Sequence, residues 1–564
     1  DDGSNTDGFM TEHMEFADQL AGYVESEHPE FLVNKLYYDA YKKDMTAGTY
    51  PDVRSGLQKL LKDGLLLFNY TGHGGTTALS DEKVLTQTDI NQFTYTHLPV
   101  WVTATCDFTR FDDLNTSAGE DVFLNKSSGG IALFTTVRVA YSRPNFPIND
   151  NVIRNLFERN NGRRRTLGEV MQATKNTLSS VYKLGFCLIG DPAVKIAYPE
   201  FGMKVTTVNG QSVDGNSISF KALEKITVEG EVLDVSGQLV TDFTGIVNPT
   251  VKDSKVTVTC LKNSNKDDSP AFTFTDYPNT IFIGNDSVRN GKFSFTFTVP
   301  KDISYSNLQG KMNLYAVDTE SGNEAQGNFD NFIVGGTSDT AETDTIGPEI
   351  RALYLNDTTF VDGGQVNTTP YFVAELWDKS GVNITGSSVG HDMMLVIDES
   401  TVLSYNLNSY YELLPGEDGT GIVKFPIPAL EPGKHTAEFW VWDILNNSTV
   451  RTFTFEVVEG LKPFLFDVIA TPGIAREQVT FHLMHNRPES RMRVGIMVYD
   501  LAGRQLWKHE ESGTSGLFEN YTVSWDLTSG GARMRPGVYI YRAAISTDNS
   551  KDATKARKFI ILGE

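Results

Sequence analysis

A histidine and a cysteine each stand at the end of an apolar run in the first third of the chain. His73 follows "LLLFNYTG" and lies between glycines, and Cys106 follows "LPVWVTAT". If both runs are neighbouring strands of a parallel sheet, their carboxyl ends meet at one edge, and the imidazole and the thiol share one crevice. A thiol needs a base or an ion-pair partner to become a thiolate, and histidine fills that role near neutral pH. The pair predicts nucleophilic catalysis by Cys106 with His73.

The backbone beside these residues is suited to the same chemistry. The glycines next to His73 let a substrate carbonyl approach closely, and the N–H groups of Gly74 and Cys106 are candidates for an oxyanion hole. Taken singly, the two side chains fit a histidine in a glycine-rich turn and a small buried cysteine. Their joint position at two strand ends favours catalysis.

A loop after a third strand-like run is the candidate for substrate binding. The segment "TTVRVAYS" follows "GGIALF" and places Val137, Arg138 and Tyr141 where they could line the crevice. The Arg138 guanidinium could bind a carboxylate, although a surface arginine is the alternative. No acid marks a pocket for basic side chains, so trypsin-like specificity is not predicted.

Residues 1–197 alternate helical and strand-like segments, which is typical of a mainly parallel sheet covered by helices. Helical signals cover residues 13–26, 50–64, 117–125, 151–160 and 167–182. Strand-like runs cover residues 31–41, 65–72, 98–106, 129–136 and 186–196. The sequence therefore predicts an α/β domain in which the helices position the two strand ends.

Helical periodicity is lost after residue 198, and short alternating strands with Gly, Asn and Asp between them follow. This pattern predicts all-β modules. We expect a β-sandwich at 198–343, an Ig-like β-sandwich at 344–461 and a last β-sandwich at 462–564. The predicted fold class is thus multidomain, α/β plus all-β.

Composition limits the classes of function. The formal net charge of −23 argues against nucleic acid as a partner, because a polyanion repels phosphates. No apolar run approaches the roughly 18 residues that cross a bilayer. No Cys/His cluster has zinc spacing and no phosphate-binding glycine loop is present, so no metal is predicted at the site. Cys187 and Cys260 lie in apolar strand contexts typical of inert thiols.

Two motifs identify a family resemblance. "NYTGHGG" followed by "TATCDFT" resembles the gingipain family of cysteine peptidases, and "FCLIGDPAV" resembles the closing strand of that family. The resemblance covers residues 1–197 and implies a caspase-like fold with a Cys106–His73 dyad. It also implies that the α/β domain begins upstream of "DDG". Family members bind calcium, so a structural Ca²⁺ is possible, and the oxygen-rich "DDGSNTDG" is one candidate, with a flexible terminus as the favoured alternative.

Some members of the gingipain family use an acid to orient the histidine. Glu15 and Asp18 are the candidates here, since residues three apart share one helix face. A solvated acidic pair in the first turn explains them equally well. Glu120 lies three residues after Ser117, and this spacing instead predicts a capping box that starts a helix.

The last module carries a second resemblance. "VYDLAGRQLW", "PGVYIYR" and "ARKFIIL" resemble the C-terminal sorting domain of type IX secretion cargo, although "ATPGIAREQVTF" replaces the usual Asn-Pro opening. The resemblance implies export by type IX secretion to the cell surface. It also implies that this domain docks the protein on an outer-membrane β-barrel partner (PorV-like).

The two middle modules resemble gingipain-family sortases of type IX secretion. The resemblance rests on "YAVDTESGNEAQGNFDNFIVGG" and "ELWDKSGVNITGSSVGHDMMLVID". It implies a cysteine peptidase and transpeptidase that removes the sorting domain of cargo proteins and links them to an amine of anionic lipopolysaccharide. A secreted endopeptidase of gingipain type and a non-enzymatic surface scaffold are the alternatives.

Overall fold

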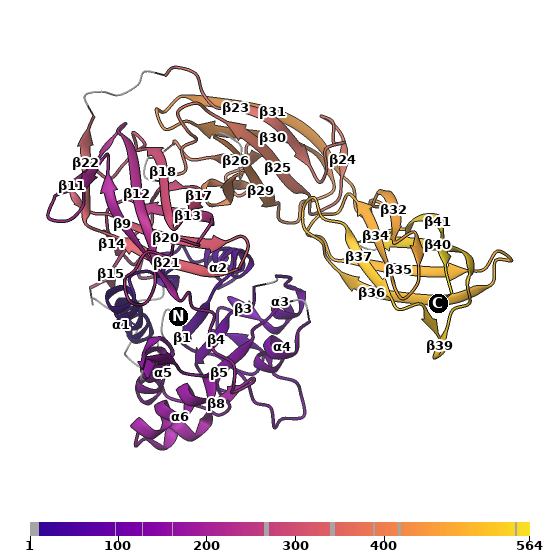
Figure 1. Ribbon diagram of the computed structural model, residues 1–564, viewed down its shortest axis with the longest axis horizontal. Helices are drawn as coiled ribbons and strands as arrows, with labels where there is room; N and C mark the ends of the chain where they lie inside the picture. The colour runs from indigo at the N-terminus through magenta and orange to yellow at the C-terminus, as the bar shows by residue number, and fades with distance from the viewer. Residues whose placement is uncertain are drawn as a thin grey trace.

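The computed structural model describes residues 11–95, 97–126, 128–160, 162–263, 270–338, 344–386, 390–414, 419–547 and 550–563. An α/β domain comes first, and three β modules follow in chain order (Figure 1). The first β module lies against α1 and α2 of the α/β domain, and the last module lies at the far end of the molecule. The predicted fold class, α/β followed by all-β modules, is confirmed.

The α/β domain is built around a four-stranded sheet of order β1-β4-β5-β8. β1, β4 and β5 are parallel, and β8 is antiparallel to β5. The strands are β1 Leu67–Thr71, β4 Val100–Ala104, β5 Ala132–Thr136 and β8 Phe186–Ile189, with short strands β2 Ala78–Leu79, β3 Leu85–Thr86, β6 Arg159–Asn160 and β7 Arg163–Arg164. The helices are α1 Glu12–Glu27, α2 Pro51–Asp63, α3 Gln87–Gln92, α4 Ala118–Leu124, α5 Ser142–Phe157 and α6 Leu167–Thr177.

Helices bury both faces of this sheet, which explains why its strands are apolar throughout rather than alternating. Trp101 and Leu133 face the α2 side of the sheet, while Val102 and Phe134 face the α5 and α6 side. All four side chains are at most 1% exposed. The two cores fix the strands that carry His73 and Cys106.

Local signals set the ends of several helices. Gly64 ends α2 with a φ of 102°, and its N–H bonds to the carbonyl of Leu60 at 3.1 Å. The predicted capping box of α4 is present, because the Glu120 carboxylate accepts from the Ser117 N–H at 2.8 Å. Glu120 therefore starts a helix, as expected.

Two expected elements differ. Residues 32–37 are extended but belong to no strand, although their pattern predicts one. The helix expected over 167–182 ends at Thr177, and a 3₁₀ turn at Val181–Gly185 follows it. A strand is defined by its pairing, and among the described residues no strand lies beside residues 32–37.

The first β module contains a nine-stranded sheet, in which β21 also pairs with β9, and a three-stranded sheet of order β11-β22-β19. A phenylalanine-rich core lies between them. Its strands are β9 Phe201–Val208, β10 Gln211–Ser212, β11 Ile218–Ala222, β12 Lys225–Leu233, β13 Gly245–Lys252, β14 Val256–Thr259, β15 Thr273–Asp276, β16 Thr280–Ile283, β17 Asp286–Arg289, β18 Lys292–Thr298, β19 Leu308–Gln309, β20 Lys311–Asp318, β21 Glu324–Phe329 and β22 Phe332–Thr337.

The second β module is a sandwich of two sheets, of orders β23-β25-β29-β28 and β24-β31-β30-β26-β27. The sheets enclose a separate core. Its strands are β23 Glu349–Leu355, β24 Gln365–Val366, β25 Tyr371–Trp377, β26 Met394–Ile397, β27 Ser404–Asn406, β28 Tyr411–Leu413, β29 Thr420–Pro426, β30 Gly433–Trp442 and β31 Ser448–Val457.

The last module is a smaller sandwich with sheets β32-β34-β37 and β33-β41-β40-β35-β36. Its strands are β32 Leu465–Thr471, β33 Ile474–Ala475, β34 Val479–His485, β35 Met492–Tyr499, β36 Gln505–Gly513, β37 Tyr521–Trp525, β38 Thr528–Ser529, β39 Ala532–Arg533, β40 Gly537–Ser546 and β41 Ala553–Ile561. In the described part of the chain, no helix has the length and apolar character needed to span a membrane.

A buried histidine makes the last module sensitive to acid. The Arg487 N–H donates to His485 Nδ1, so Nε2 carries the proton and donates to Ser515 Oγ at 2.8 Å. Burial, with a smaller contribution from Arg487, lowers the pKa of His485 to about 4. Because the folded pKa lies below the unfolded value, the neutral form stabilises the module above pH about 6.5, and this stability is lost as the pH falls toward 4.

We therefore expect the module to lose up to about 3 kcal/mol of stability between pH 6.5 and 4 because of His485. A His485→Gln variant keeps a donor for Ser515 and does not titrate, so its loss over this range should be smaller by that amount. Hydrogen exchange of the β34 amides at both pH values measures the difference. An equal loss in both proteins would contradict the assignment.

Candidate functional site

The sheet register brings His73 and Cys106 to the same level. Thr71 of β1 pairs with Ala104 of β4 as the last pair of the two strands. His73 and Cys106 each come two residues later, and adjacent strands lie about 4.8 Å apart. The two loops also touch, since a Cβ added to Gly74 would lie 2.5 Å from Thr105 Oγ1. The predicted dyad residues therefore share one edge of the sheet.

The loop of His73 is held by three contacts. The Tyr70 hydroxyl donates to the His73 carbonyl at 2.6 Å, and the Ser80 N–H donates to the same oxygen at 2.8 Å. The His13 ring meets the His73 ring edge-on, with centroids 5.0 Å apart and an interplanar angle of 83°. The carbonyl contacts fix the backbone, and His13 limits the orientations that the imidazole can adopt.

The thiol of Cys106 lies under the loop that follows β5. Sγ donates a hydrogen bond to the Ala140 carbonyl at 3.0 Å, and the Ala140 N–H lies 3.4 Å from Sγ. The next residue, Asp107, has a φ of 49°, and its N–H bonds to the Arg138 carbonyl at 3.4 Å. This left-handed turn directs the chain away immediately after the nucleophile. The thiol must leave Ala140 before it can act as a thiolate.

The two N–H groups predicted to form an oxyanion hole are available. Among the residues that the structure describes, no backbone hydrogen bond engages the N–H of Gly74 or of Cys106. Both groups follow strand ends at the same edge of the sheet. They can therefore donate to the oxygen of a tetrahedral intermediate formed at Cys106.

Position 74 accepts only glycine. An added Cβ would meet Thr105 Oγ1 at 2.5 Å and the Ala78 carbonyl at 3.3 Å, and Thr105 is only 2% exposed. We expect Gly74→Ala to displace the oxyanion donor and reduce kcat by about 10²-fold. Steady-state kinetics on a cleavable substrate measures the loss. Gly75→Ala is the matched control, because nothing lies within 4 Å of its added Cβ. Equal activity of both variants would contradict the role of Gly74.

The residues predicted to bind substrate have different surroundings. Arg138 forms a two-point ion pair with Asp112, at 3.0 and 2.5 Å, and each partner moves the other's pKa, raising that of Arg138 and lowering that of Asp112. Its guanidinium is thus engaged by a carboxylate of the same chain. Val137 is 6% exposed and packs inward, so the prediction that its side chain lines the crevice is wrong. Tyr141 is 65% exposed, next to Ala140, and its ring lies edge-on to Tyr182.

The acids proposed to orient His73 make other contacts. Asp18 accepts from Lys35 Nζ at 3.0 Å and from the Tyr37 hydroxyl at 3.1 Å, so it ties α1 to residues 32–37. Glu15 is exposed and accepts from Thr11 Oγ1 at 2.5 Å. These contacts of the two carboxylates are structural.

Glu12 and His13, in the first turn of α1, are the residues that sequence reasoning missed. Glu12 is 8% exposed and accepts from the Ser142 hydroxyl and from Arg143 Nε, the latter at 2.9 Å. It joins the start of α1 to the start of α5, and His13 reaches His73 from the same turn. The local signal was present, because both are ionisable residues at the beginning of a predicted helix.

The candidate calcium segment "DDGSNTDG" lies outside the described residues. A different group of oxygen ligands lies in the second β module, where Asp344, Asp378 and Asp443 place carboxylate oxygens within 4.8 Å of one another. Burial raises the pKa of Asp378 to about 6 and also raises that of Asp443. Clustered carboxylates are the ligands that Ca²⁺ prefers, so these residues fit the ion better than any site near the dyad.

The two remaining cysteines are not nucleophile candidates. Cys260 is 4% exposed, and burial raises its pKa to about 12. Cys187 lies within β8, away from the strand ends that carry the dyad. Neither forms a disulfide. Cys106 is therefore the thiol whose position fits nucleophilic chemistry.

Comparisons with known proteins agree with this site. Residues 1–197 match the model of peptidase family C25, and this part of the chain is a cysteine peptidase-like domain. The chain as a whole is PorU-like: it is 36% identical to the dimeric latent PorU from Porphyromonas gingivalis, covering 78% of this chain and 41% of that chain, with a TM-score of 0.33. The chain thus spans less than half the length of the PorU chain that it matches.

Two further solved structures are similar over half of the chain. The Arg-specific cysteine proteinase gingipain R (RgpB) is 18% identical, covering 50% of this chain and 56% of that chain, with a TM-score of 0.25. The complex of the pro- and mature domains of Porphyromonas gingivalis RgpB is 19% identical, covering 50% and 57%, with a TM-score of 0.24. A comparison with curated proteins found no match.

Proposed function

We propose that the protein is a cysteine endopeptidase whose nucleophile is Cys106 and whose base is His73. The observation that carries the proposal is the register of β1 and β4, which places both residues two positions beyond the last strand pair of a domain that matches peptidase family C25. The unengaged N–H groups of Gly74 and Cys106 support it. This arrangement is suited to acyl transfer.

The chemistry follows from these positions. His73 takes the thiol proton, and the thiolate attacks the carbonyl carbon of the scissile bond. The N–H groups of Gly74 and Cys106 stabilise the oxyanion. The imidazolium then gives its proton to the leaving nitrogen, the C–N bond breaks, and an acyl thioester remains on Cys106. A second nucleophile attacks this thioester, loses its proton to His73 and releases the thiolate.

We further propose that the enzyme is a sortase of type IX secretion. In this account the scissile bond precedes the C-terminal sorting domain of a cargo protein, and the second nucleophile is an amine of anionic lipopolysaccharide. The support is the combination of a peptidase family C25 domain with a last module whose sequence resembles a sorting domain. That module would hold the enzyme at the cell surface through an outer-membrane β-barrel partner.

One experiment separates this proposal from its alternatives. Purified protein is incubated with a cargo protein that carries its sorting domain, with glycine amide present, and intact masses are measured. Cargo that has lost the domain and gained the amine supports transpeptidation. Cargo that is only hydrolysed supports a secreted endopeptidase instead. Cargo left unchanged by a protein whose Cys106 can be alkylated would contradict both enzymatic accounts and favour a scaffold.

A further inference from the structure

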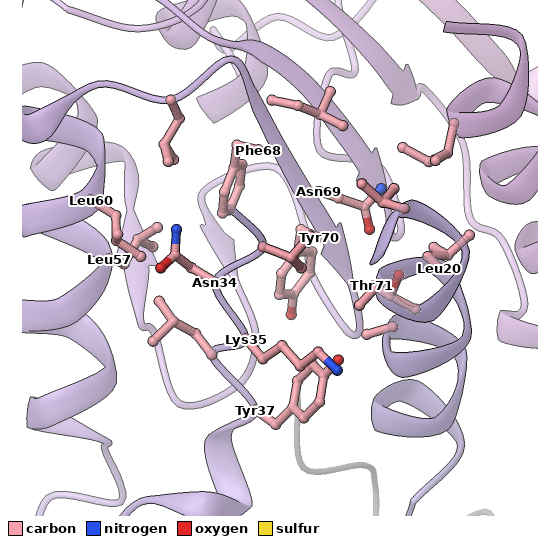
Figure 2. A pocket seen from close by; sticks show the side chains of 18 of the residues that line it. Leu20, Asn34, Lys35, Tyr37, Leu57, Leu60, Phe68, Asn69, Tyr70 and Thr71 are labelled. Carbon is pink, nitrogen blue, oxygen red and sulfur yellow. The ribbon is translucent and has the colours of Figure 1, made fainter. Parts of the chain in front are cut away.

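A cavity of about 260 Å³ lies beside β1 in the α/β domain (Figure 2). Leu20 of α1 lines it from one helix layer, and Leu57 and Leu60 of α2 line it from the other. Protein interiors contain few voids larger than a water molecule, so an apolar space of this size inside a two-layered domain is exceptional. Its position between the helix layers is the position that a strand of the sheet occupies.

One wall of the cavity is the outer edge of the sheet. β1 ends the strand order β1-β4-β5-β8, and all five of its residues line the cavity. The strand partner of β1 in the described part of the chain is β4. An edge strand presents backbone N–H and C=O groups to whatever lies beside it. These groups face an enclosed space rather than the surface of the protein.

The opposite wall is the extended segment 31–38, which the sequence pattern predicts to be a strand. Its side chains alternate: Lys35 donates to Asp18 on α1 and to the Thr275 carbonyl at 2.8 Å, while Leu36 and Tyr38 pack in the core on the α2 side. No backbone hydrogen bond joins this segment to β1 among the described residues. Two extended backbones thus face each other across a space lined by helices on both sides.

The order of the chain indicates what fills this space. α1 begins at Glu12, and His13 touches His73, so the helix starts at the edge where the parallel strands end. A strand that leads into α1 by a short loop ends at that same edge and runs parallel to β1. Residues 31–38 then follow α1, and β1 follows α2. A strand preceding α1 therefore has its place between segment 31–38 and β1.

We propose that this cavity is the seat of a β-strand from the protein's own polypeptide, N-terminal to Asp1, and that this strand pairs with β1. The occupant is about five residues long, to match β1. It is apolar on both faces, as β4 and β5 are, because helices cover it on both sides. The seat lies beside the strand that ends two residues before His73, so filling it also steadies the loop that carries the catalytic base.

A surrogate strand tests the proposal. The segment Val-Ile-Val-Ile-Val, joined to Asp1 by a Gly/Ser linker, is compared with the same fusion carrying Asn-Asp-Asn-Asp-Asn. The apolar fusion should slow hydrogen exchange of the β1 amides at least 10-fold and raise the unfolding temperature by about 5 °C or more. The polar fusion should change neither. Equal behaviour of the two fusions would overturn the proposal.

Two controls keep the result specific. Leu57→Trp partly fills the cavity, so the apolar fusion should protect β1 less in this variant. The same five residues added as a free peptide should protect β1 only weakly, and protection as strong as that of the fusion would contradict an intramolecular occupant. Exchange and unfolding do not depend on the Cys106 reaction, so this test is independent of the proposed enzymatic function.

Discussion

Replacing Cys106 by alanine should reduce release of a cargo sorting domain by about 10⁴-fold or more, because the reaction then lacks its nucleophile. The fold should not change, since Cys106 is only partly buried and its thiol bonds to the backbone of Ala140. Release of the domain can be followed by intact mass over time. The residual rate reflects binding and the oxyanion donors alone.

Cys187→Ala is the matched control for this substitution. Its thiol lies in β8 of the same sheet, at a distance from the strand ends of β1 and β4. Its activity should stay within about twofold of the wild-type value, the range of a small buried substitution that leaves the site intact. Normal processing by Cys106→Ala, or loss of processing in Cys187→Ala alone, would be incompatible with the assigned nucleophile.

Replacing His73 by alanine should lower kcat/KM by about 10³- to 10⁴-fold, because no base remains to take the thiol proton. A merely structural histidine would not change the reactivity of the thiol. The rate at which iodoacetamide alkylates Cys106 near neutral pH should therefore fall together with kcat/KM, since the thiolate is the reactive form.

His13→Ala separates the base from its neighbour. His13 meets His73 edge-on, ring against ring, so we expect a loss of about tenfold, the scale of a lost orienting contact. A loss as large as that of His73→Ala would require His13 to take part in the proton transfer itself. Unchanged alkylation in His73→Ala would remove the case for a dyad.

Much of the α/β domain could be predicted because its signals are local. The apolar runs that became β1, β4 and β5 are continuous, and Gly64 and the Ser117–Glu120 box mark helix ends by their own chemistry. The position of a histidine and a cysteine just beyond two such runs was enough to place both at one edge. The register of Thr71 with Ala104 then fixed their level.

The remaining features depend on contacts that the local sequence does not encode. Arg138 finds Asp112 across the loop, Val137 packs inward against the core, and Asp18 pairs with Lys35 rather than with the site. Residues 31–38 have the composition of a strand, yet a strand also needs a neighbour to pair with. Only the assembled sheet shows which partner each side chain or backbone edge finds.

The most direct test of the central claim is to trap the acyl intermediate. Wild-type protein is mixed with a cargo protein bearing its sorting domain, quenched in acid within seconds, digested and mapped by mass spectrometry. The account predicts a thioester adduct of the cargo on the peptide that contains Cys106, absent from Cys106→Ala and lost on adding hydroxylamine. Cleaved cargo with no adduct on Cys106, or with an adduct on another residue, would contradict it.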